Sequence, residues 1–408
     1  MFANFTGWLL CFAALGIPFA SRRIRHDPAL ARVTVFSLAV HQLVSFLQVF
    51  FKPLPTVDAD AVAFNTYALG RGAEALEHVG YAEFLRDLYH VVAGSHLLGC
   101  QLSNLAFAIS LVAFVELLVV LEREAHAPAL MVMFACLPSC VLNTSVVLRE
   151  AWQICCFLIL LLAVVHYRRF DVSGLTLAGF ASSLVLVFLH NVFPVIVAGV
   201  LGIGYFWASQ PHRSKQAVRG GMVLCSLMLL PIVLPRLVER SAVVRMIQSG
   251  KILQYADNYQ EGVNEGRSSF RARLDLSSPG RFLLSAPGLY ATYLFAPFPW
   301  DIRGPKDLAG LLECFFRLCL FGSILLSLRD RCLPQRECAL FLFVVFLVVE
   351  ALWSTGTTNW GTAFRHRLVA YPIMVALGGP YLLARLADAD GARELRARRA
   401  RRLQPETA

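Results

Sequence analysis

The chain is poor in charged residues. Only 16% of its 408 residues are Asp, Glu, Lys or Arg, whereas a soluble globular domain carries about 25%. Hydrophobic residues make up 57% of the sequence and the mean hydropathy is +0.60. This composition excludes an ordinary soluble domain and indicates a protein that lies largely within a membrane.

Several functional signatures are also missing. No phosphate-cradling glycine loop or nucleotide-binding domain is present, which argues against an ATP-driven protein. The eleven cysteines mostly fall in apolar segments and give neither a disulfide framework nor a zinc site. The formal charge of +10 comes from arginines spread over short loops without interleaved aromatic residues, so we do not expect a nucleic-acid partner.

Long apolar segments are present along the whole chain. They have about the 17 to 25 residues needed to cross a bilayer, and they are continuous, not alternating, which excludes a β-barrel. We expect an all-α, polytopic transmembrane helical bundle of about 11 spans. The first segment lacks a basic start and a small-residue cleavage site, so we interpret it as a span and not as a signal peptide. The expected spans are 2–20, 33–51, 92–120, 128–143, 151–166, 173–189, 193–208, 220–236, 308–327, 338–352 and 368–386.

The arginines predict the orientation, because cytoplasmic loops are enriched in Lys and Arg. Arginines follow the first, fifth and seventh spans, precede the tenth and fill the tail. All fall on one side if residues 282–298 form a re-entrant or interfacial segment. We therefore expect a bacterial inner-membrane protein with one transmembrane domain, 1–386, a basic cytoplasmic tail, 387–408, and contacts with membrane lipids. The outer loops are then 52–90, 237–307 and 353–367.

The first outer loop contains two closely spaced carboxylates, Asp58 and Asp60. Either could act as a general base, and the pair could bind a metal. The alternatives are a solvated loop, or an N-cap of a helix that starts near Ala61. Apolar residues at helical spacing over 73–90 predict an amphipathic surface helix, with a plain connector as the alternative.

Cationic residues are expected on the same face. Arg365, His366 and Arg367 precede the last span, where they could hold a phosphate or simply reach the interface by snorkelling. Arg149 and Glu150 either contact substrate or fix two helices by a salt bridge. Lys251 and Arg271, in the second outer loop, are weaker candidates for phosphate binding.

Four short motifs occur in order on this outer face. Asp60-Ala61-x-x-Phe64-Asn65-x-x-Ala68 resembles the Asp-x-x-x-Tyr-x-x-x-Ala pattern of membrane-embedded GT-C glycosyltransferases, a superfamily that includes protein O-mannosyltransferases. Three further stretches resemble its bacterial members with many spans: Leu148-Arg149-Glu150, Pro297-Phe298-Pro299-Trp300 and Asn359-Trp360-Gly361-Thr362-Ala363-Phe364-Arg365-His366-Arg367. With the order of the spans, the resemblance covers nearly the whole chain.

The resemblance implies transfer of a sugar from a polyprenyl-phosphate donor to a glycan or lipid acceptor of the cell envelope. It makes Asp60 the catalytic base, with Asp58 as its neighbour. It also implies that Arg365 and Arg367 stabilise the lipid phosphate. No cofactor is expected, although a divalent metal stays open. The alternatives are an O-antigen or exopolysaccharide polymerase that uses the arginines of loop 237–307 on undecaprenyl-diphosphate glycans, and a flippase or transporter lined by His41, His96 and His190.

Overall fold

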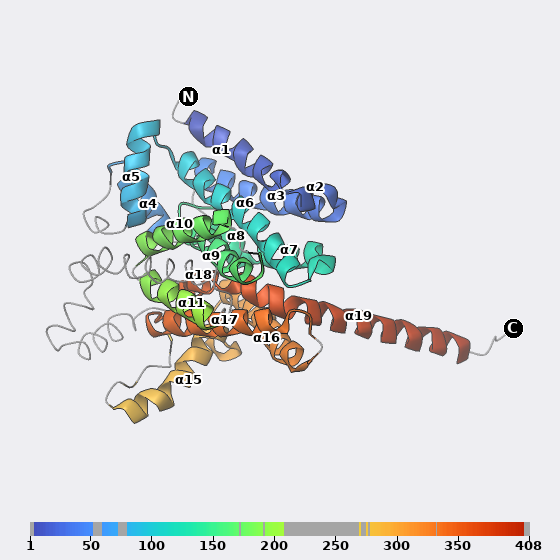
Figure 1. Ribbon diagram of the computed structural model, residues 1–408. Helices are drawn as coiled ribbons and strands as arrows, with labels where there is room; N and C mark the ends of the chain where they lie inside the picture. Colours follow the sequence, from blue (N-terminus) through green and yellow to red (C-terminus); the bar gives the residue numbers. More distant parts are fainter. Residues whose placement is uncertain are drawn as a thin grey trace.

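The computed structural model describes residues 4–51, 59–71, 80–170, 173–190, 192–207, 269–270, 275, 278–331 and 333–403. All named elements of these residues are helices (Figure 1), and their one extended pairing is an isolated bridge between Ser269 and Asn359. The protein is therefore all-helical over the part described, as the sequence predicts.

The first half of the chain forms α1 to α11 and two 3₁₀ turns. They are α1 (Phe5–Gly16), η2 (Ile17–Ala20), α2 (Arg22–His26), α3 (Pro28–Phe50), α4 (Ala59–Ala68), α5 (Gly80–Val92), α6 (His96–Val120), η4 (Glu124–His126), α7 (Ala127–Ala135), α8 (Pro138–Thr144), α9 (Glu150–Phe170), α10 (Ser173–Leu189) and α11 (Phe193–Trp207). The second half forms α15 (Pro279–Phe295), η5 (Pro299–Asp301), α16 (Pro305–Arg329), α17 (Arg336–Thr355), α18 (Trp360–His366) and α19 (Tyr371–Leu403).

Among the described residues, four helices are long and apolar enough to cross a membrane, namely α3, α6, α16 and α17. The number rises to six if each of two bent helix pairs counts as one span. Apolar helices occupy ten of the predicted spans, but several of them are too short to qualify, and residues 220–236 lie outside the described residues. The predicted count of about 11 spans is therefore not confirmed.

Two predicted membrane segments are interrupted. The segment 128–143 is divided into α7 and α8, which meet at 67°, because Pro138 starts a new helix after an extended Leu137. α18 and α19 meet at 80°. α19 then continues through the predicted tail as helix to Leu403 and projects from the bundle in Figure 1. The residues beside the second interruption become important at the site.

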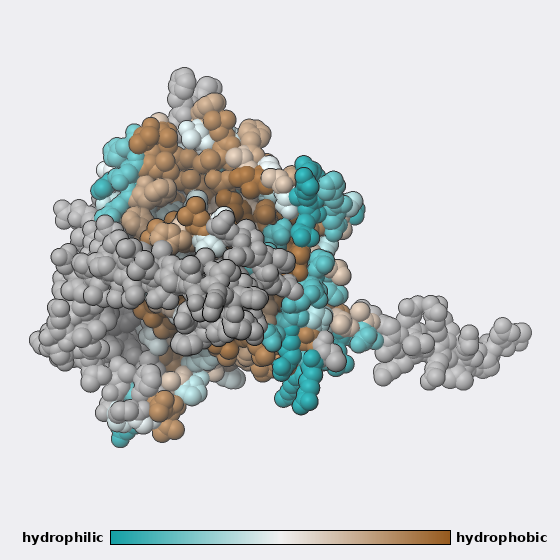
Figure 2. All heavy atoms as spheres, viewed as in Figure 1, coloured by the Kyte–Doolittle hydropathy of each residue, from teal (hydrophilic) through white to brown (hydrophobic). Residues whose placement is uncertain are grey.

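Hydrophobic and hydrophilic residues occupy different parts of the surface. Figure 2 shows hydrophobic residues over the body around α1, where Phe5, Trp8 and Phe12 are exposed, and hydrophilic residues at the end that carries α2 and the α16–α17 connection. α4 and α5 lie at the opposite end (Figure 1). The predicted orientation of the basic loops and the acidic first loop on opposite sides of a membrane stays a prediction.

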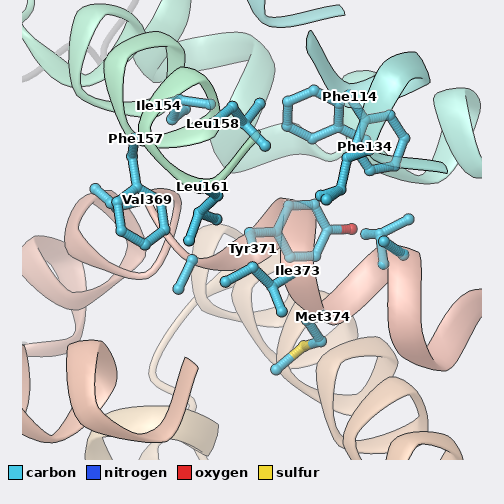
Figure 3. Close-up of a cluster of buried hydrophobic side chains, with 14 of the residues drawn as sticks. Phe114, Phe134, Ile154, Phe157, Leu158, Leu161, Val369, Tyr371, Ile373 and Met374 are labelled. Carbon is cyan, nitrogen blue, oxygen red and sulfur yellow. The ribbon is translucent and has the colours of Figure 1, made fainter. Parts of the chain in front are cut away.

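The core is built from close-packed apolar side chains of α6, α7, α9 and α19. Phe134 contacts Phe114 with ring centroids 4.8 Å apart and Tyr371 at 6.4 Å. Figure 3 shows these rings together with aliphatic side chains of α9. The Tyr371 hydroxyl donates to the carbonyl of Met133 at 2.7 Å, so the one polar atom of this ring is satisfied inside the core.

A buried polar seam joins α3 to α6 within this apolar bundle. Gln42 and Gln101 exchange two side-chain hydrogen bonds of 2.9 and 2.7 Å. Asn104 donates to Ser45 at 2.9 Å, and Ser45 donates in turn to the carbonyl of Ser145 at 2.5 Å. Reciprocal amide pairs of this kind fix the register of two helices, because a slip would leave each amide unsatisfied in an apolar surrounding.

We expect Gln101→Leu to destabilise the protein by about 1–2 kcal/mol, because it leaves the buried Gln42 amide without its partner. The double variant Gln42→Leu/Gln101→Leu is expected to recover part of this loss. Thermal unfolding in detergent measures both effects. If the double variant loses more unfolding free energy than the two single variants lose together, the proposed pairing is contradicted.

Candidate functional site

Asp60 lies in the first turn of α4, which begins at Ala59. The Asp60 side chain is 54% exposed. α4 packs against α5 through Phe64 and Tyr81, whose rings meet edge to face at 5.5 Å. The helix that we expected over 73–90 is present from Gly80 as α5, with Tyr81, Leu85 and Tyr89 buried at helical spacing, and residues 73–79 lie outside the described residues. Its role here is to hold α4 in place.

Arg365 joins Asp60 to Glu150. Its Nη1 donates to Asp60 Oδ2 at 2.6 Å, across 305 residues of sequence. Its Nε and Nη2 donate to Glu150 Oε1 at 2.9 and 2.7 Å. Arg365 and Glu150 are buried, with 6% and 1% exposure. One guanidinium thus serves two carboxylates, one buried and one facing solvent. Three residues predicted from the sequence are brought into direct contact.

Glu150 owes its position to an irregular segment before α9. Residues 145–149 are not helical, so their carbonyls need partners from elsewhere. Ser45 donates to the carbonyl of Ser145, and Ser103 donates to that of Leu148 at 3.2 Å. Glu150 then starts α9, where the helix dipole favours a negative charge. The buried polar seam therefore supports the site directly.

Arg149 does not pair with its neighbour Glu150. Its Nη1 donates to the carbonyl of Leu189 at 3.3 Å, and its guanidinium lies 5.9 Å from the centre of the Phe64 ring. Burial lowers the pKa of Arg149, although an arginine keeps its charge at neutral pH. The salt bridge that we considered between two helices does exist, but it joins Glu150 to Arg365.

His366 faces an aromatic wall beside Arg365. Its ring stacks on Trp353 at 3.9 Å and lies 6.1 Å from the ring of His190. Thr357 donates to the carbonyl of Trp353 at 2.7 Å, so it accepts from His366 Nδ1 at 2.8 Å. This assigns the Nδ1–H tautomer and leaves Nε2 as the acceptor. Burial, with Arg149 and Arg365 nearby, lowers the pKa of His190, which is therefore neutral at pH 7.

Arg367 is engaged with the protein itself. Its Nη1 donates to the carbonyl of Leu294 at 3.2 Å and to the Cys314 sulfur at 3.3 Å, and its Nη2 donates to the carbonyl of Ala296 at 3.0 Å. It is 1% exposed. These contacts connect the α18–α19 break to the end of α15 and to α16. Its predicted role at a lipid phosphate stays a prediction.

Other predicted site residues lie outside the described residues. These are Asp58, Lys251 and Arg271, with most of loop 237–307. His41 stacks on Phe107 at 4.0 Å and contacts the carbonyl of Ser37, while His190 contacts Trp353. These two histidines therefore have separate partners. Among the described residues no group of three or more His, Cys, Asp or Glu side chains is arranged to hold a metal ion.

Several buried polar atoms around this cluster have no partner in the described structure. They are Tyr81 Oη, Ser145 Oγ, Arg149 Nε, Glu150 Oε2, Trp152 Nε1, both amide atoms of Gln153, and Trp353 Nε1. Native proteins satisfy nearly all such groups with protein, water or ligand. Water or a bound polar ligand can supply the missing partners of these atoms. Four of them, Arg149 Nε, Trp152 Nε1, Gln153 Nε2 and Trp353 Nε1, are N–H donors, which suit an oxyanion.

The structure also shows buried charges that sequence reasoning missed. Glu313 and Arg317 lie in α16 and Glu350 lies in α17, each at most 5% exposed. These residues could have been singled out from the sequence, since a charge inside an apolar span is energetically costly.

A cavity of about 720 Å³ lies away from the candidate site, between η2, α2 and α6, and is lined by Arg22, Arg23 and Glu116 among others.

Comparison of the chain with protein-family models, curated proteins and solved structures finds no match. The resemblance to GT-C glycosyltransferases therefore stays a prediction. The functional argument rests on the charges and contacts of the Asp60–Arg365–Glu150 cluster.

Removal of the shared guanidinium has a defined expected effect. Arg365→Gln leaves Glu150 buried without a counter-charge and is expected to destabilise the protein by about 3–5 kcal/mol. Asp60→Asn breaks only the solvent-facing half of the cluster and is expected to change stability by at most about 1 kcal/mol. Thermal unfolding of both variants measures the difference. Equal losses would contradict the unequal burial of the two carboxylates.

Proposed function

We propose that the protein is a membrane glycosyltransferase that moves a sugar from a polyprenyl-phosphate donor to a hydroxyl of a cell-envelope glycan or lipid. The observation that carries this proposal is the contact between Asp60 and Arg365. A solvent-facing carboxylate and a buried guanidinium meet at the end of an apolar bundle, opposite the basic loops. The proposal takes the carboxylate as the base and the guanidinium as the anion-binding group of one site.

Asp60 is the proposed general base. The acceptor hydroxyl attacks the anomeric carbon of the sugar and transfers its proton to the Asp60 carboxylate. The bond from the anomeric carbon to the phosphate oxygen breaks, and polyprenyl phosphate leaves with the electron pair. The exposed half of Asp60 gives the acceptor access. Because Arg365 also donates two hydrogen bonds to Glu150, it is a shared partner, and Asp60 does not neutralise it alone.

Arg365 and Arg149 are proposed to stabilise the negative charge that develops on the leaving phosphate. The unpartnered N–H groups of Arg149, Trp152 and Trp353 are donors of the kind that phosphate oxygens accept. The stacked rings of Trp353 and His366 offer an aromatic surface next to these donors. Glu150 acts as a positioning residue, because it holds Arg365 in place through two hydrogen bonds.

Asp60→Asn is expected to reduce sugar transfer by at least about 100-fold, because amides do not accept the proton and general-base catalysis contributes factors of this size. Binding of the polyprenyl-phosphate donor is expected to stay within a few-fold of the wild type. The measurement is product formation from a radiolabelled lipid-linked sugar in membranes, together with donor binding to purified protein.

Asp87→Asn is the matched control for this experiment. Asp87 lies on α5 in the same loop, is 74% exposed and, among the residues that the structure describes, forms an ion pair with the neighbouring Arg86 at 3.5 Å. Its replacement removes one outer-face carboxylate without touching Arg365. Transfer that survives Asp60→Asn, or that falls equally in both variants, rules out Asp60 as the base.

A further inference from the structure

A second group of ionisable side chains lies inside the candidate membrane spans. Glu313 and Arg317 project from α16, Glu350 from α17, and Arg367 from the α18–α19 break. All are buried, with exposures of 5%, 1%, 1% and 1%. Charges at such positions are costly in a membrane and mark functional positions by default. The four residues differ in how well each is satisfied.

Glu313 and Arg317 form a complete pair. Arg317 Nε and Nη2 donate to Glu313 Oε1 at 3.2 and 3.1 Å. Ser139 donates to Glu313 twice, from its backbone N–H at 3.0 Å and from its hydroxyl at 2.5 Å. The Arg317 guanidinium also lies 4.6 Å from the centre of the Tyr371 ring. This carboxylate has the charge partner and the donors that an ionised group requires.

Glu350 has neither. Its Oε2 is buried without a hydrogen-bond partner. The Nε and Nη2 of Arg317 go to Glu313, and the terminal nitrogens of Arg367 go to two carbonyls and a thiol. No described hydrogen bond therefore reaches Glu350 from either guanidinium.

The polar groups that face Glu350 come from three directions. They are Tyr290 and Tyr293 on α15, Arg317 on α16 and Arg367 at the α18–α19 break. Tyr290 donates to the carbonyl of Leu347 at 3.4 Å. The Tyr293 hydroxyl is buried without a partner, as is Arg367 Nε. Glu350, Tyr293 and Arg367, each at least nine-tenths buried, thus each carry one side-chain atom without a hydrogen-bond partner.

An ionised carboxylate without donated hydrogen bonds loses several kcal/mol of solvation on burial. Such a group usually takes up a proton and becomes neutral. We propose that Glu350 holds a proton in the folded protein and forms, with Tyr293, a buried proton-binding site beneath the candidate functional site. Glu350 is one helical turn from Trp353, whose ring stacks on His366.

The proton determines the charge of the inner cluster. With Glu350 neutral, Arg317 and Arg367 outnumber Glu313 by one positive charge, and with Glu350 ionised the cluster is neutral. An excess positive charge beneath the outer face favours binding of an anionic group there. This consequence rests on the proposed function, whereas the proton itself does not.

Infrared spectroscopy tests the proton directly, on purified full-length protein in lipid nanodiscs without any substrate. The wild type is expected to show a carboxylic-acid C=O band at neutral pH that shifts in D₂O, and Glu350→Gln is expected to lack it. A difference spectrum in which Glu350→Gln instead loses a carboxylate band overturns the proposal.

Thermal unfolding gives an independent test with a matched variant. Glu350→Gln replaces a neutral acid by a neutral amide and is expected to leave the melting temperature unchanged. Glu313→Gln removes the counter-charge of Arg317 and is expected to lower it. If Glu350 is instead the ionised partner of Arg367, Glu350→Gln lowers the melting temperature as Glu313→Gln does, and the proposal fails.

Binding of polyprenyl phosphate at several pH values tests the electrostatic consequence. In the wild type the affinity is expected to fall as the pH rises and Glu350 loses its proton, because the excess positive charge disappears. Glu350→Gln keeps that charge, so its affinity is expected to fall less. An equal fall in both proteins overturns the coupling. Absence of binding in both proteins refutes the proposed function, while the infrared band still decides the proton.

Discussion

The structure of the candidate site depends on one buried guanidinium with two unequal partners. Arg365 is stabilised by a carboxylate, because a buried charge without any partner would be strongly unfavourable. Glu150 fills that requirement inside the protein. The contact with Asp60 is therefore additional, and it brings a solvent-facing carboxylate to a guanidinium that is already held in place. Glu150 thus stabilises the buried guanidinium, and Asp60 is the carboxylate proposed to take part in the chemistry.

Interruptions in apolar helices supply most of the site. The irregular segment 145–149 precedes Glu150, and the break between α18 and α19 follows Arg365. Backbone that leaves a helix in an apolar environment needs other hydrogen-bond partners. Ser45 and Ser103 provide them for the first interruption. Arg367 ties the second to the end of α15. Polar side chains within the spans, such as Ser45 and Ser103, thus hold in place the backbone that carries the site residues at the span ends.

The sequence predicted the helical class, most apolar segments and three residues that meet at the site, because hydrophobic run length and misplaced charges are local signals. It did not predict the breaks, since Pro138 is compatible with either a kink or a helix start. It also could not assign partners. Arg149 and Glu150 are adjacent, yet Glu150 pairs with a residue 215 positions away. Such pairing follows from tertiary packing. Glu313 and Glu350 are recognisable in the sequence as charges in apolar segments, but the sequence does not show which groups lie around them.

Arg365 and Arg367 show why a cationic motif cannot be interpreted as a unit. Two positions apart around a helix end, their side chains reach different neighbours: Arg365 meets carboxylates of α4 and α9, and Arg367 meets carbonyls of α15. Arg365 is paired with carboxylates of opposite charge, whereas Arg367 is stabilised by the dipoles of backbone carbonyls. Dipoles stabilise the positive charge of Arg367 without cancelling it. This charge therefore acts on Glu350 within the bundle. The same short motif therefore links the solvent-facing carboxylate to the buried one, which is the physical reason for considering the two clusters together.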